Sequence, residues 1–432
     1  MEQRPTTPAS AVATARRRLA ARLAAAALVA VSVPLAAPSP DPRLVPGGGD
    51  GWADGVAGLL GYGLVSRPAA YLCLLWLAIA LWIAVLLLAR ELGLRLVATT
   101  AGALIVLFAL APPLLSLDVF SYISYGRLGV EHGLNPYQHA PAAIPGDAAA
   151  SRVVDYREAV SVYGPVFTLL SYPLAAAGVP FALWSLKAIA AAAIAATAWI
   201  VARLARRRGV DPAAATAFVA LNPLVLVHLV GGAHNDALMV AIATAAVAAA
   251  LTSRPALAGA GFVLAAAVKV SGLLYAPFAL LGAAPARSRA RMLAGAALAA
   301  ALAGAISLAA FGPAIDAALT VAGENQDRIS RWSVAATAAR VSGIDVGPIR
   351  TLLAIGLAVA LAGLAVAVAR GFDWVRAAGW AALGVLVASA YIVPWYVLWV
   401  LPPAAISRDR ALIGATILLT AFQAVNGVAV SP

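Results

Sequence analysis

Long apolar runs separated by short polar stretches dominate the chain between residues 17 and 428. A helix needs about 20 apolar residues to cross a bilayer, and most of these runs approach that length. We therefore predict an all-α polytopic membrane protein with about 13 transmembrane helices. The predicted spans are 17–37, 69–89, 96–116, 181–203, 213–231, 236–251, 256–269, 271–284, 291–311, 348–368, 377–393, 395–406 and 411–428.

The polar interruptions predict how the chain is organised. Residues 1–16 are polar and predict a disordered cytoplasmic N-terminus, followed by a single transmembrane domain over 17–428. The segments 117–180 and 313–347 are the two large extracytoplasmic loops. Within the first loop, the apolar run 165–178 is short for a span and predicts an interfacial or re-entrant helix.

The first apolar run allows two interpretations. Three arginines, Arg16, Arg17 and Arg18, precede a small-residue apolar run, and this pattern also fits a secretory signal peptide. We favour a retained first span because many more spans follow, although the sequence leaves both alternatives open.

Composition narrows the class of protein. Hydrophobic residues make up 63% of the 432 residues and charged residues only 11%, whereas about a quarter of a soluble domain is charged. So few charges cannot cover a water-facing surface, which excludes disordered chains, coiled coils and ordinary soluble enzymes. A net charge of +12 is typical of a membrane protein with basic cytoplasmic loops. We therefore predict that the protein is embedded in a lipid bilayer and that it does not bind nucleic acid.

The charges fall unevenly on the two sides of the predicted spans. With the N-terminus inside, 19 of the 30 basic residues and five of the 18 acidic residues face the cytoplasm. The net charge is then +14 inside and −2 outside, as the positive-inside rule requires. All four histidines and both lysines face outward with most of the acids, so we expect the chemistry on the extracytoplasmic side.

Asp118 is the first candidate for that chemistry. It follows an apolar run directly, and a carboxylate at the membrane boundary is costly unless it is solvated, paired or functional. In a helix, Asp118, Tyr122 and Tyr125 would share one face. A helix-capping aspartate beside interfacial aromatic side chains is the simpler explanation, and the residues alone leave both open.

Three further polar segments break the apolar pattern. Residues 135–137 (Asn-Pro-Tyr) and 163–165 (Tyr-Gly-Pro) are turn signals when taken singly. Residues 231–236 (Gly-Gly-Ala-His-Asn-Asp) form either a tight loop with a capping aspartate or a binding site. His234 and Asp236 could bind a metal, but no second cluster has ligand spacing, so we predict no metal.

The remaining candidates are cationic or aromatic. Lys269 lies in a stretch of small apolar residues, where a lysine is functional unless it snorkels to the interface. Arg328 and Arg331 lie in the 313–347 loop. Trp395 and Tyr396 lie where two short spans meet, and there they form an aromatic belt or offer flat faces to a sugar.

Several common motifs are missing from the sequence. It contains no Walker-type phosphate loop, no GxGxxG motif and no Asp-x-Asp pair. The last of these is the usual means by which a soluble-type transferase holds a metal and a nucleotide sugar.

Taken in order, the motifs resemble those of a known family. The matching segments are 118–122 (DVFSY), 126–127 (GR), 135–137 (NPY), 163–165 (YGP), 222–223 (NP), 231–239 (GGAHNDALM), 267–269 (AVK) and 394–396 (PWY). They are similar to the actinobacterial polyprenol-phosphate-mannose-dependent α-1,6-mannopyranosyltransferases of the GT-C superfamily of membrane glycosyltransferases. The resemblance covers roughly residues 115–405. It implies a GT-C-like helical bundle with an outer-face catalytic loop that contains short interfacial helices.

The resemblance implies an inverting mannosyl transfer on the outer face of the plasma membrane, without a cofactor. The donor would be polyprenyl-phosphate-mannose and the acceptor a growing lipid-linked α-1,6-mannan of the lipomannan or lipoarabinomannan type. Asp118 would be the general base, with Asp236 as its rival. Cations would stabilise the phosphate leaving group. The substrate-binding candidates are Tyr122, Arg127, Tyr163, His234, Asn235, Asp236, Lys269, Arg328, Arg331, Trp395 and Tyr396.

Other functions compete with this interpretation. A transporter or flippase of a lipid-linked sugar should show internal repeats and midplane polar residues, and a scaffold should show no one-sided polar cluster. The sequence has no repeat, and its polar residues gather on one side. A GT-C enzyme that uses another polyprenyl-phosphate sugar remains open, because pocket shape determines which sugar is bound.

Overall fold

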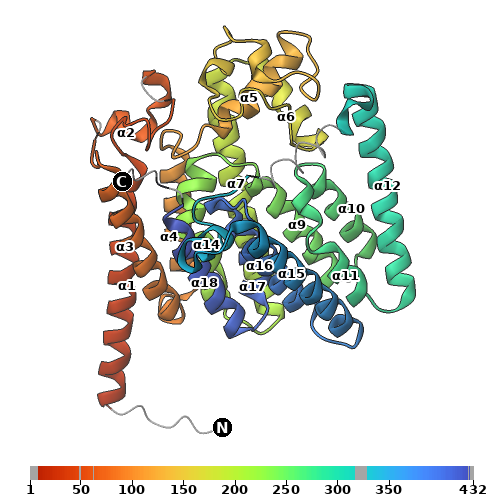
Figure 1. Ribbon diagram of the computed structural model, residues 1–432. Coiled ribbons are helices and arrows are strands. Elements are labelled where there is room, and N and C mark those ends of the chain that lie inside the picture. The colour runs from red at the N-terminus through yellow and green to blue at the C-terminus, as the bar shows by residue number, and fades with distance from the viewer. Residues whose placement is uncertain (1–7, 48–49, 62, 317–327, 427, 429–432) are drawn as a thin grey trace.

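The computed structural model describes residues 8–47, 50–61, 63–316, 328–426 and 428, and all regular elements in these ranges are helical (Figure 1). The first half contains α1 (Pro8–Ala36), η1 (Gly51–Ala53), α2 (Gly55–Leu59), α3 (Pro68–Leu87), α4 (Ala89–Ala109), α5 (Asp118–Val130), η2 (Pro141–Ala143), η3 (Ala150–Arg152), α6 (Pro165–Ala176), α7 (Val179–Arg207) and α8 (Pro212–Ala220). The second half contains η4 (Val225–Gly231), α9 (Asp236–Leu251), α10 (Pro255–Ala266), η5 (Val270–Leu273), α11 (Ala276–Gly282), α12 (Ala286–Phe311), η6 (Gly312–Asp316), α14 (Val334–Ser342), α15 (Val346–Ala369), α16 (Trp374–Ala388), η8 (Pro394–Trp399), α17 (Leu401–Ile406) and α18 (Arg410–Ala424). The predicted all-α class is therefore confirmed for the described residues.

Six helices of the described chain are long and apolar enough to cross a membrane. They are α1 from Val12 onward, α3, α4, α7, α12 and α15. The pair α8 and η4 makes a seventh if it counts as one span bent by 58°. The other six predicted spans coincide with apolar helices of 10–17 residues, which are short for a crossing. The count of about 13 is not confirmed by this criterion.

The N-terminal region differs from its prediction. The structure has α1 from Pro8, whereas the sequence predicted disorder through residue 16. Alanine has the highest helix propensity, and the alanine-rich segment continues the helix of the apolar run without a break. Residues 1–7 lie outside the described residues.

α7 is the central helix of the bundle. It packs against α4, α8 and α9. Within its most apolar 18-residue stretch, 50% is buried inside the protein. By contrast, only 11% of the corresponding stretch of α12 is buried, and only 6% of that of α15. In Figure 1, α1 and α12 flank the bundle on opposite sides.

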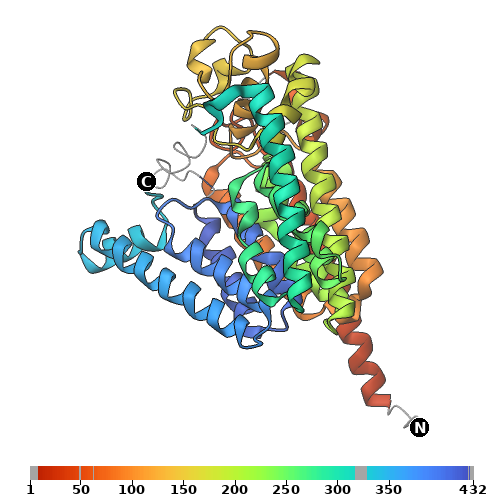
Figure 2. The same ribbon diagram turned by 90° about the vertical axis from the view of Figure 1, so that its right-hand side faces the viewer.

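The segment 117–180 forms a cap at one end of the bundle. Its helices α5 and α6 pack together and lie at the top of Figures 1 and 2. The run predicted as an interfacial helix contains α6, which has 12 residues. α7 starts directly after the cap and has 29 residues, so at 1.5 Å per residue its far end lies about 43 Å away.

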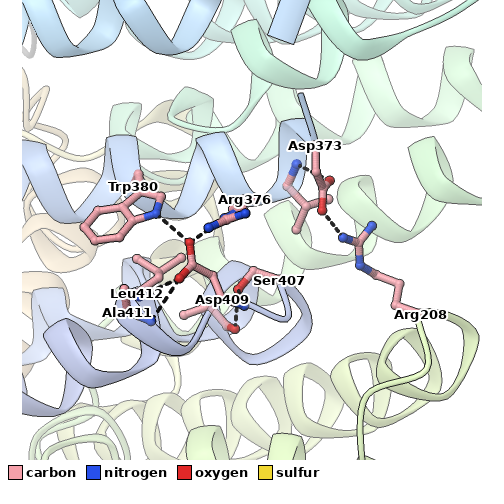
Figure 3. A network of polar contacts seen from close by, with 10 residues as sticks. Arg208, Asp373, Arg376, Trp380, Ser407, Asp409, Ala411 and Leu412 are labelled. Atoms are coloured by element: carbon pink, nitrogen blue, oxygen red, sulfur yellow. Dashed lines mark hydrogen bonds and ion pairs between the residues drawn. The ribbon is translucent and has the colours of Figure 1, made fainter. Parts of the chain in front are cut away.

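That far end carries a polar network around the buried side chain of Asp409 (Figure 3). Asp409 caps α18 by accepting from the backbone N–H groups of Ala411 and Leu412. Its other carboxylate oxygen accepts from Arg376 Nε at 2.5 Å and Trp380 Nε1 at 2.8 Å. Nearby, Arg208 at the end of α7 pairs with Asp373, which caps α16. We call these residues the Asp409 network.

Candidate active site

Asp118 is the first residue of α5 and lies at the base of the cap. The residue in the N-cap position is Leu117, whose side chain makes no capping hydrogen bond, and the N–H of Asp118 donates to Ser116 Oγ at 3.1 Å, so the simpler explanation of Asp118 as a cap is wrong. The carboxylate Oδ2 lies 3.4 Å from Nδ1 of His234, and 19% of the Asp118 side chain is exposed. Asp118 is therefore held beside an imidazole while part of it stays accessible.

The surroundings of Asp118 favour its ionised form. Burial would raise the pKa of this carboxyl group, but the hydrogen bond and the charge of His234, together with the charge of Lys269, outweigh burial. The net effect lowers the pKa of Asp118 below its ordinary value. A carboxylate held in this way can accept a proton from a neighbouring hydroxyl group.

His234 links the cap to the C-terminal helices. Its ring stacks on Trp395 with the centroids 3.6 Å apart and the planes at 17°. Its Nδ1 also lies 3.5 Å from the hydroxyl of Tyr122 on α5. The imidazole is fully buried, and Nε2 has no hydrogen-bond partner among the described residues. The predicted Asp118–Tyr122 face therefore meets the 231–236 segment at His234.

Lys269 and Asp236 form an ion pair next to this cluster. Lys269 Nζ lies 2.7 Å from Asp236 Oδ2, and Trp399 donates to the other carboxylate oxygen at 2.8 Å. The ammonium group also lies 4.7 Å from the centre of the Tyr396 ring. Asp236 is fully buried and both its oxygens are occupied, so it is poorly placed to act as the rival base.

The Tyr-Gly-Pro motif at 163–165 joins the cap to the Lys269 segment. The backbone N–H groups of Gly164 and Val166 donate to the carbonyls of Val268 and Ala267, at 3.0 and 2.9 Å. A Cβ atom at Gly164 would lie 2.2 Å from the Ala267 oxygen, so this close approach requires glycine. The ring of Tyr163 meets Tyr122 edge-on at 4.9 Å. The motif is therefore more than a turn, because it fixes the chain that carries Lys269.

The Asn-Pro-Tyr motif at 135–137 holds the cap together. Asn135 Oδ1 accepts from the N–H of Tyr137, and Nδ2 donates to the Phe311 carbonyl at the end of α12. The hydroxyl of Tyr137 donates to the Tyr163 carbonyl at 2.8 Å. These contacts support the turn interpretation and position the cap over the bundle.

The structure does not bring all three candidate arginines to the active site. Arg127 donates to Asp147 at 2.7 Å within the cap. Arg331 lies over the Trp332 ring, 5.6 Å from its centre. Arg328 lies 4.7 Å from the centre of the Tyr156 ring, so only Arg328 is next to a residue of the cavities described below.

Three cavities meet around Asp118 and Lys269. A pocket of about 60 Å³ is lined by both residues and by Tyr163, Trp395 and Tyr396. We call it the central pocket. An apolar cavity of about 610 Å³ between α11, α15 and α16 has Lys269 in its wall, and we call it the apolar cavity. A third cavity of about 670 Å³ is lined by Asp118, Arg152, His228 and Trp395, and we call it the outer cavity.

Tyr156 and Tyr391 form a contact that the sequence did not reveal. Their hydroxyl groups lie 2.6 Å apart. Tyr391 lines all three cavities, and Tyr156 lines the central pocket and the outer cavity. The two residues are 235 positions apart, so no local pattern could have indicated the pair.

Lys187 and His228 were also missed as parts of the site. Lys187, fully buried on α7, donates to the carbonyl of Gly231 at 2.6 Å and so holds the start of the 231–236 segment. His228 lies on the π-helix η4, and 0% of it is exposed. The signal in the sequence was a lone polar residue inside each apolar run.

Asn235 is a further buried polar residue of this segment. Both amide atoms of Asn235 are buried without a hydrogen-bond partner in the described part of the chain. No group of three or more His, Cys, Asp or Glu side chains among the described residues has an arrangement that could hold a metal ion.

Comparisons with known proteins point to one family. The family described as alpha-(1->6)-mannopyranosyltransferase, N-terminal domain, matches residues 23–285. Alpha-(1->6)-mannopyranosyltransferase A of Corynebacterium glutamicum is 29% identical over 193 residues, which are 44% of this chain and 39% of that protein. The protein of the same name from Mycobacterium tuberculosis is 32% identical over 175 residues, which are 39% of this chain and 33% of that protein.

The matched regions are partial. The chain covers 39% of the Corynebacterium relative and 33% of the Mycobacterium relative, so it spans about two fifths or less of their lengths. No solved structure matches the chain.

Proposed function

Since the chain belongs to the alpha-(1->6)-mannopyranosyltransferase family, we propose that it transfers mannose from polyprenyl-phosphate-mannose to a growing, lipid-linked α-1,6-mannan. The observation that carries the proposal is the central pocket, where a carboxylate and an ammonium group line one space between the apolar cavity and the outer cavity. This arrangement suits a reaction between a lipid-borne sugar phosphate and a hydroxyl group.

Asp118 acts as the general base in the proposed reaction. The acceptor hydroxyl gives its proton to the Asp118 carboxylate while its oxygen attacks C1 of the mannosyl group. The bond between C1 and the phosphate oxygen breaks with inversion, and polyprenyl phosphate leaves with the electron pair. The lowered pKa of Asp118 supports this role, because a base must be ionised before the reaction starts.

Lys269 binds the phosphate in this mechanism. An ammonium group has three N–H donors, and the bond to Asp236 uses one of them. Negative charge grows on the phosphate oxygen as the bond breaks, so a fixed cation there stabilises the transition state more than the ground state. The apolar cavity beside Lys269 suits the prenyl chain of the donor, and Arg328 next to Tyr156 offers a second cation.

The aromatic residues of the site form the sugar-binding surface. Trp395 and Tyr396 line the central pocket and offer flat faces to the mannosyl ring. His234 and Asn235 provide polar atoms for sugar hydroxyls. Tyr163 lines the same pocket, and Tyr122 packs against Tyr163. A pocket of about 60 Å³ holds only a few water molecules. We therefore expect the Tyr156–Tyr391 contact to open when the sugar binds.

The proposed membrane arrangement follows the charge asymmetry of the loops. The N-terminus and the Asp409 network face the cytoplasm, and the cap with Asp118 faces outward. We propose a GT-C-type bundle of about 13 crossing segments, in which the shorter apolar helices tilt or cross in broken pairs around the cavities. The segments 117–180 and 313–347 are its extracytoplasmic loops.

The decisive experiment follows labelled polyprenyl-phosphate-mannose with a short α-1,6-mannoside in membranes that contain the full chain. We expect a product extended by one α-1,6-mannose, at a rate that EDTA leaves unchanged because phosphate is already a good leaving group. A matched preparation with Asp345→Asn, which alters an exposed helix cap, should be equally active. Transfer only from a nucleotide sugar, or only of another sugar, would overturn the proposal.

Orientation is tested by labelling from outside intact cells. Cys73 is exposed, so it is first replaced with serine. Cysteine introduced by Val154→Cys in the cap, where the native side chain is 70% exposed, should react with a membrane-impermeant maleimide. Cysteine from Arg207→Cys should react only after permeabilisation, and the reverse pattern would contradict the proposed topology.

A further inference from the structure

His228 is a buried histidine that the fold itself does not use. It is 0% exposed, and neither ring nitrogen has a hydrogen-bond partner within the described ranges. Its ring lies 5.9 Å from that of Trp395, and its side chain lines the outer cavity together with Asp118. His228 is thus a buried residue in the wall of the cavity that also contains the proposed base.

The unpartnered imidazole stands out against another histidine of the protein. His132 contacts Asp147 at 3.1 Å and so has a structural partner. A buried polar group without a partner reduces stability, and native structures contain few of them. Such a group is explained when a ligand supplies the missing partner. The π-helical geometry of η4 is an independent indication, because short π-helical turns occur frequently at functional sites.

The charges of the outer cavity indicate the chemistry of this ligand. All three guanidinium nitrogens of Arg152 donate hydrogen bonds, to the carbonyls of Ala148 and Gly47 and to the Asp50 carboxylate. Arg43 forms an ion pair with Asp41 at 2.7 Å. Both arginines of the cavity are therefore engaged by the protein. The carboxylate of Asp118 also disfavours an anion there. A neutral polyhydroxyl compound fits these walls better than a phosphate.

We propose that His228 binds a hydroxyl group of the acceptor sugar in the outer cavity and thereby presents the attacking hydroxyl to Asp118. A neutral imidazole has one donor and one acceptor nitrogen, which matches the paired donor and acceptor character of neighbouring sugar hydroxyls. This inference rests on the proposed function, and it separates an acceptor side at His228 from a donor side at Lys269.

The test compares His228→Leu and His228→Gln with wild type in the full-length protein. His228→Leu should raise the KM for α-1,6-mannotriose at least tenfold, while the KM for polyprenyl-phosphate-mannose stays within twofold. His228→Gln keeps a donor and an acceptor and should recover part of the loss. Thr244→Val is the matched control, because Thr244 is also buried with an unpartnered hydroxyl in the described structure but lies outside the three cavities.

Thermal unfolding without substrate is a second measurement, and it distinguishes a substrate-binding role of His228 from a structural one. Leucine removes an unsatisfied polar group, so His228→Leu should melt at the same temperature as wild type or higher. It should also lose the stabilisation that α-1,6-mannotriose gives to the wild type. A lower melting temperature with an unchanged acceptor KM would overturn the role of His228.

The two proposals fail in different ways. If the wild type transfers mannose and His228→Leu has an unchanged acceptor KM, the inference is wrong and the proposed function stands. If the wild type transfers no mannose, thermal shifts with α-linked glucose, arabinofuranose and mannose oligosaccharides still test the site. Stabilisation by one of them that disappears in His228→Leu would support the sugar site alone, and stabilisation that persists would contradict it.

Discussion

The polar residues around Asp118, namely His228, His234 and Asn235, differ from the Asp409 network in how completely they are hydrogen-bonded. In the Asp409 network both carboxylate oxygens of Asp409 are occupied, one by two backbone N–H groups and one by Arg376 and Trp380 (Figure 3). Around Asp118, Nε2 of His234, both nitrogens of His228 and both amide atoms of Asn235 have no partner in the described chain. Both regions contain an aspartate beside a basic side chain.

The difference distinguishes a structural network from the site that we propose binds the substrates. A fully satisfied network fixes the ends of α7, α16 and α18 relative to one another, whereas unpartnered buried groups reduce stability and are retained where they serve function. α7 connects the two regions, since it begins at the cap and its C-terminal neighbour Arg208 pairs with Asp373. Substitutions in the two regions should therefore affect different observables.

The largest effect is expected for Asp118→Asn. The amide cannot accept the proton of the acceptor hydroxyl, so mannosyl transfer should fall about 10²- to 10⁴-fold, while the melting temperature stays close to that of wild type. Single-turnover transfer and thermal unfolding of the same preparation measure the two effects. Near-normal turnover would show that Asp118 is not the general base, and the two regions would then no longer differ in function.

Asp409→Asn should show the opposite pattern, a loss of stability with little change in activity. Hydrogen bonds to a charged group contribute about 2 kcal/mol, and unfolding in detergent at neutral pH measures the loss. Turnover measured well below the melting temperature should stay within about twofold of wild type, because the network is far from the cavities. A large loss of turnover in a folded variant would contradict a purely structural role.

The pH dependence of stability gives a second readout for the same variant. Burial raises the pKa of Asp409, but its hydrogen bonds from Trp380, Leu412 and Arg376 outweigh burial and lower it. A lowered folded-state pKa stabilises the protein above the unfolded value of about 3.9. Wild type should lose this contribution as the pH falls through the lowered pKa, and Asp409→Asn should lack that part of the pH dependence.

A smaller effect is expected for His234→Gln, which keeps a polar group beside Asp118 but removes the imidazole. Without the imidazole, the effect of burial on the pKa of Asp118 is offset less, so this pKa should rise. The acidic limb of the kcat/KM profile should therefore move to higher pH. At neutral pH we expect about a tenfold loss, or about 1.4 kcal/mol. An unchanged acidic limb would show that His234 does not tune Asp118.

Much of the site was predictable because its residues interrupt apolar runs. Asp118, His234, Asp236 and Lys269 each follow or break a run of small apolar residues, and the structure brings all four together. Polar residues are costly in such runs, so their presence indicates function without any knowledge of the fold. The helices themselves were predictable for the same reason, since each apolar run matches a helix or a bent pair.

The rest depended on contacts between distant segments. Arg127 looked like a phosphate ligand, but its partner Asp147 lies 20 residues away in a loop without periodic pattern. The contact between Tyr156 and Tyr391 joins the cap to the region after α16. His228 looked like one polar residue in a buried run, and only its missing partners and the outer cavity distinguish it. Such features follow from tertiary packing, which local pattern does not encode.

The smallest effect is expected for Arg331→Ala, because Arg331 belongs to neither region. Its guanidinium group lies 5.6 Å from the centre of the Trp332 ring, and it is absent from the walls of the three cavities. An exposed cation–π contact contributes about 0.5–1 kcal/mol, so transfer should stay within about twofold of wild type. Lys269→Ala is the matched comparison, since it removes the cation that lines the central pocket and should impair use of the donor. The measured quantity is kcat/KM for polyprenyl-phosphate-mannose. Equal losses in the two variants would mean that Arg331 contributes to binding the phosphate, and the donor side would then have to include it.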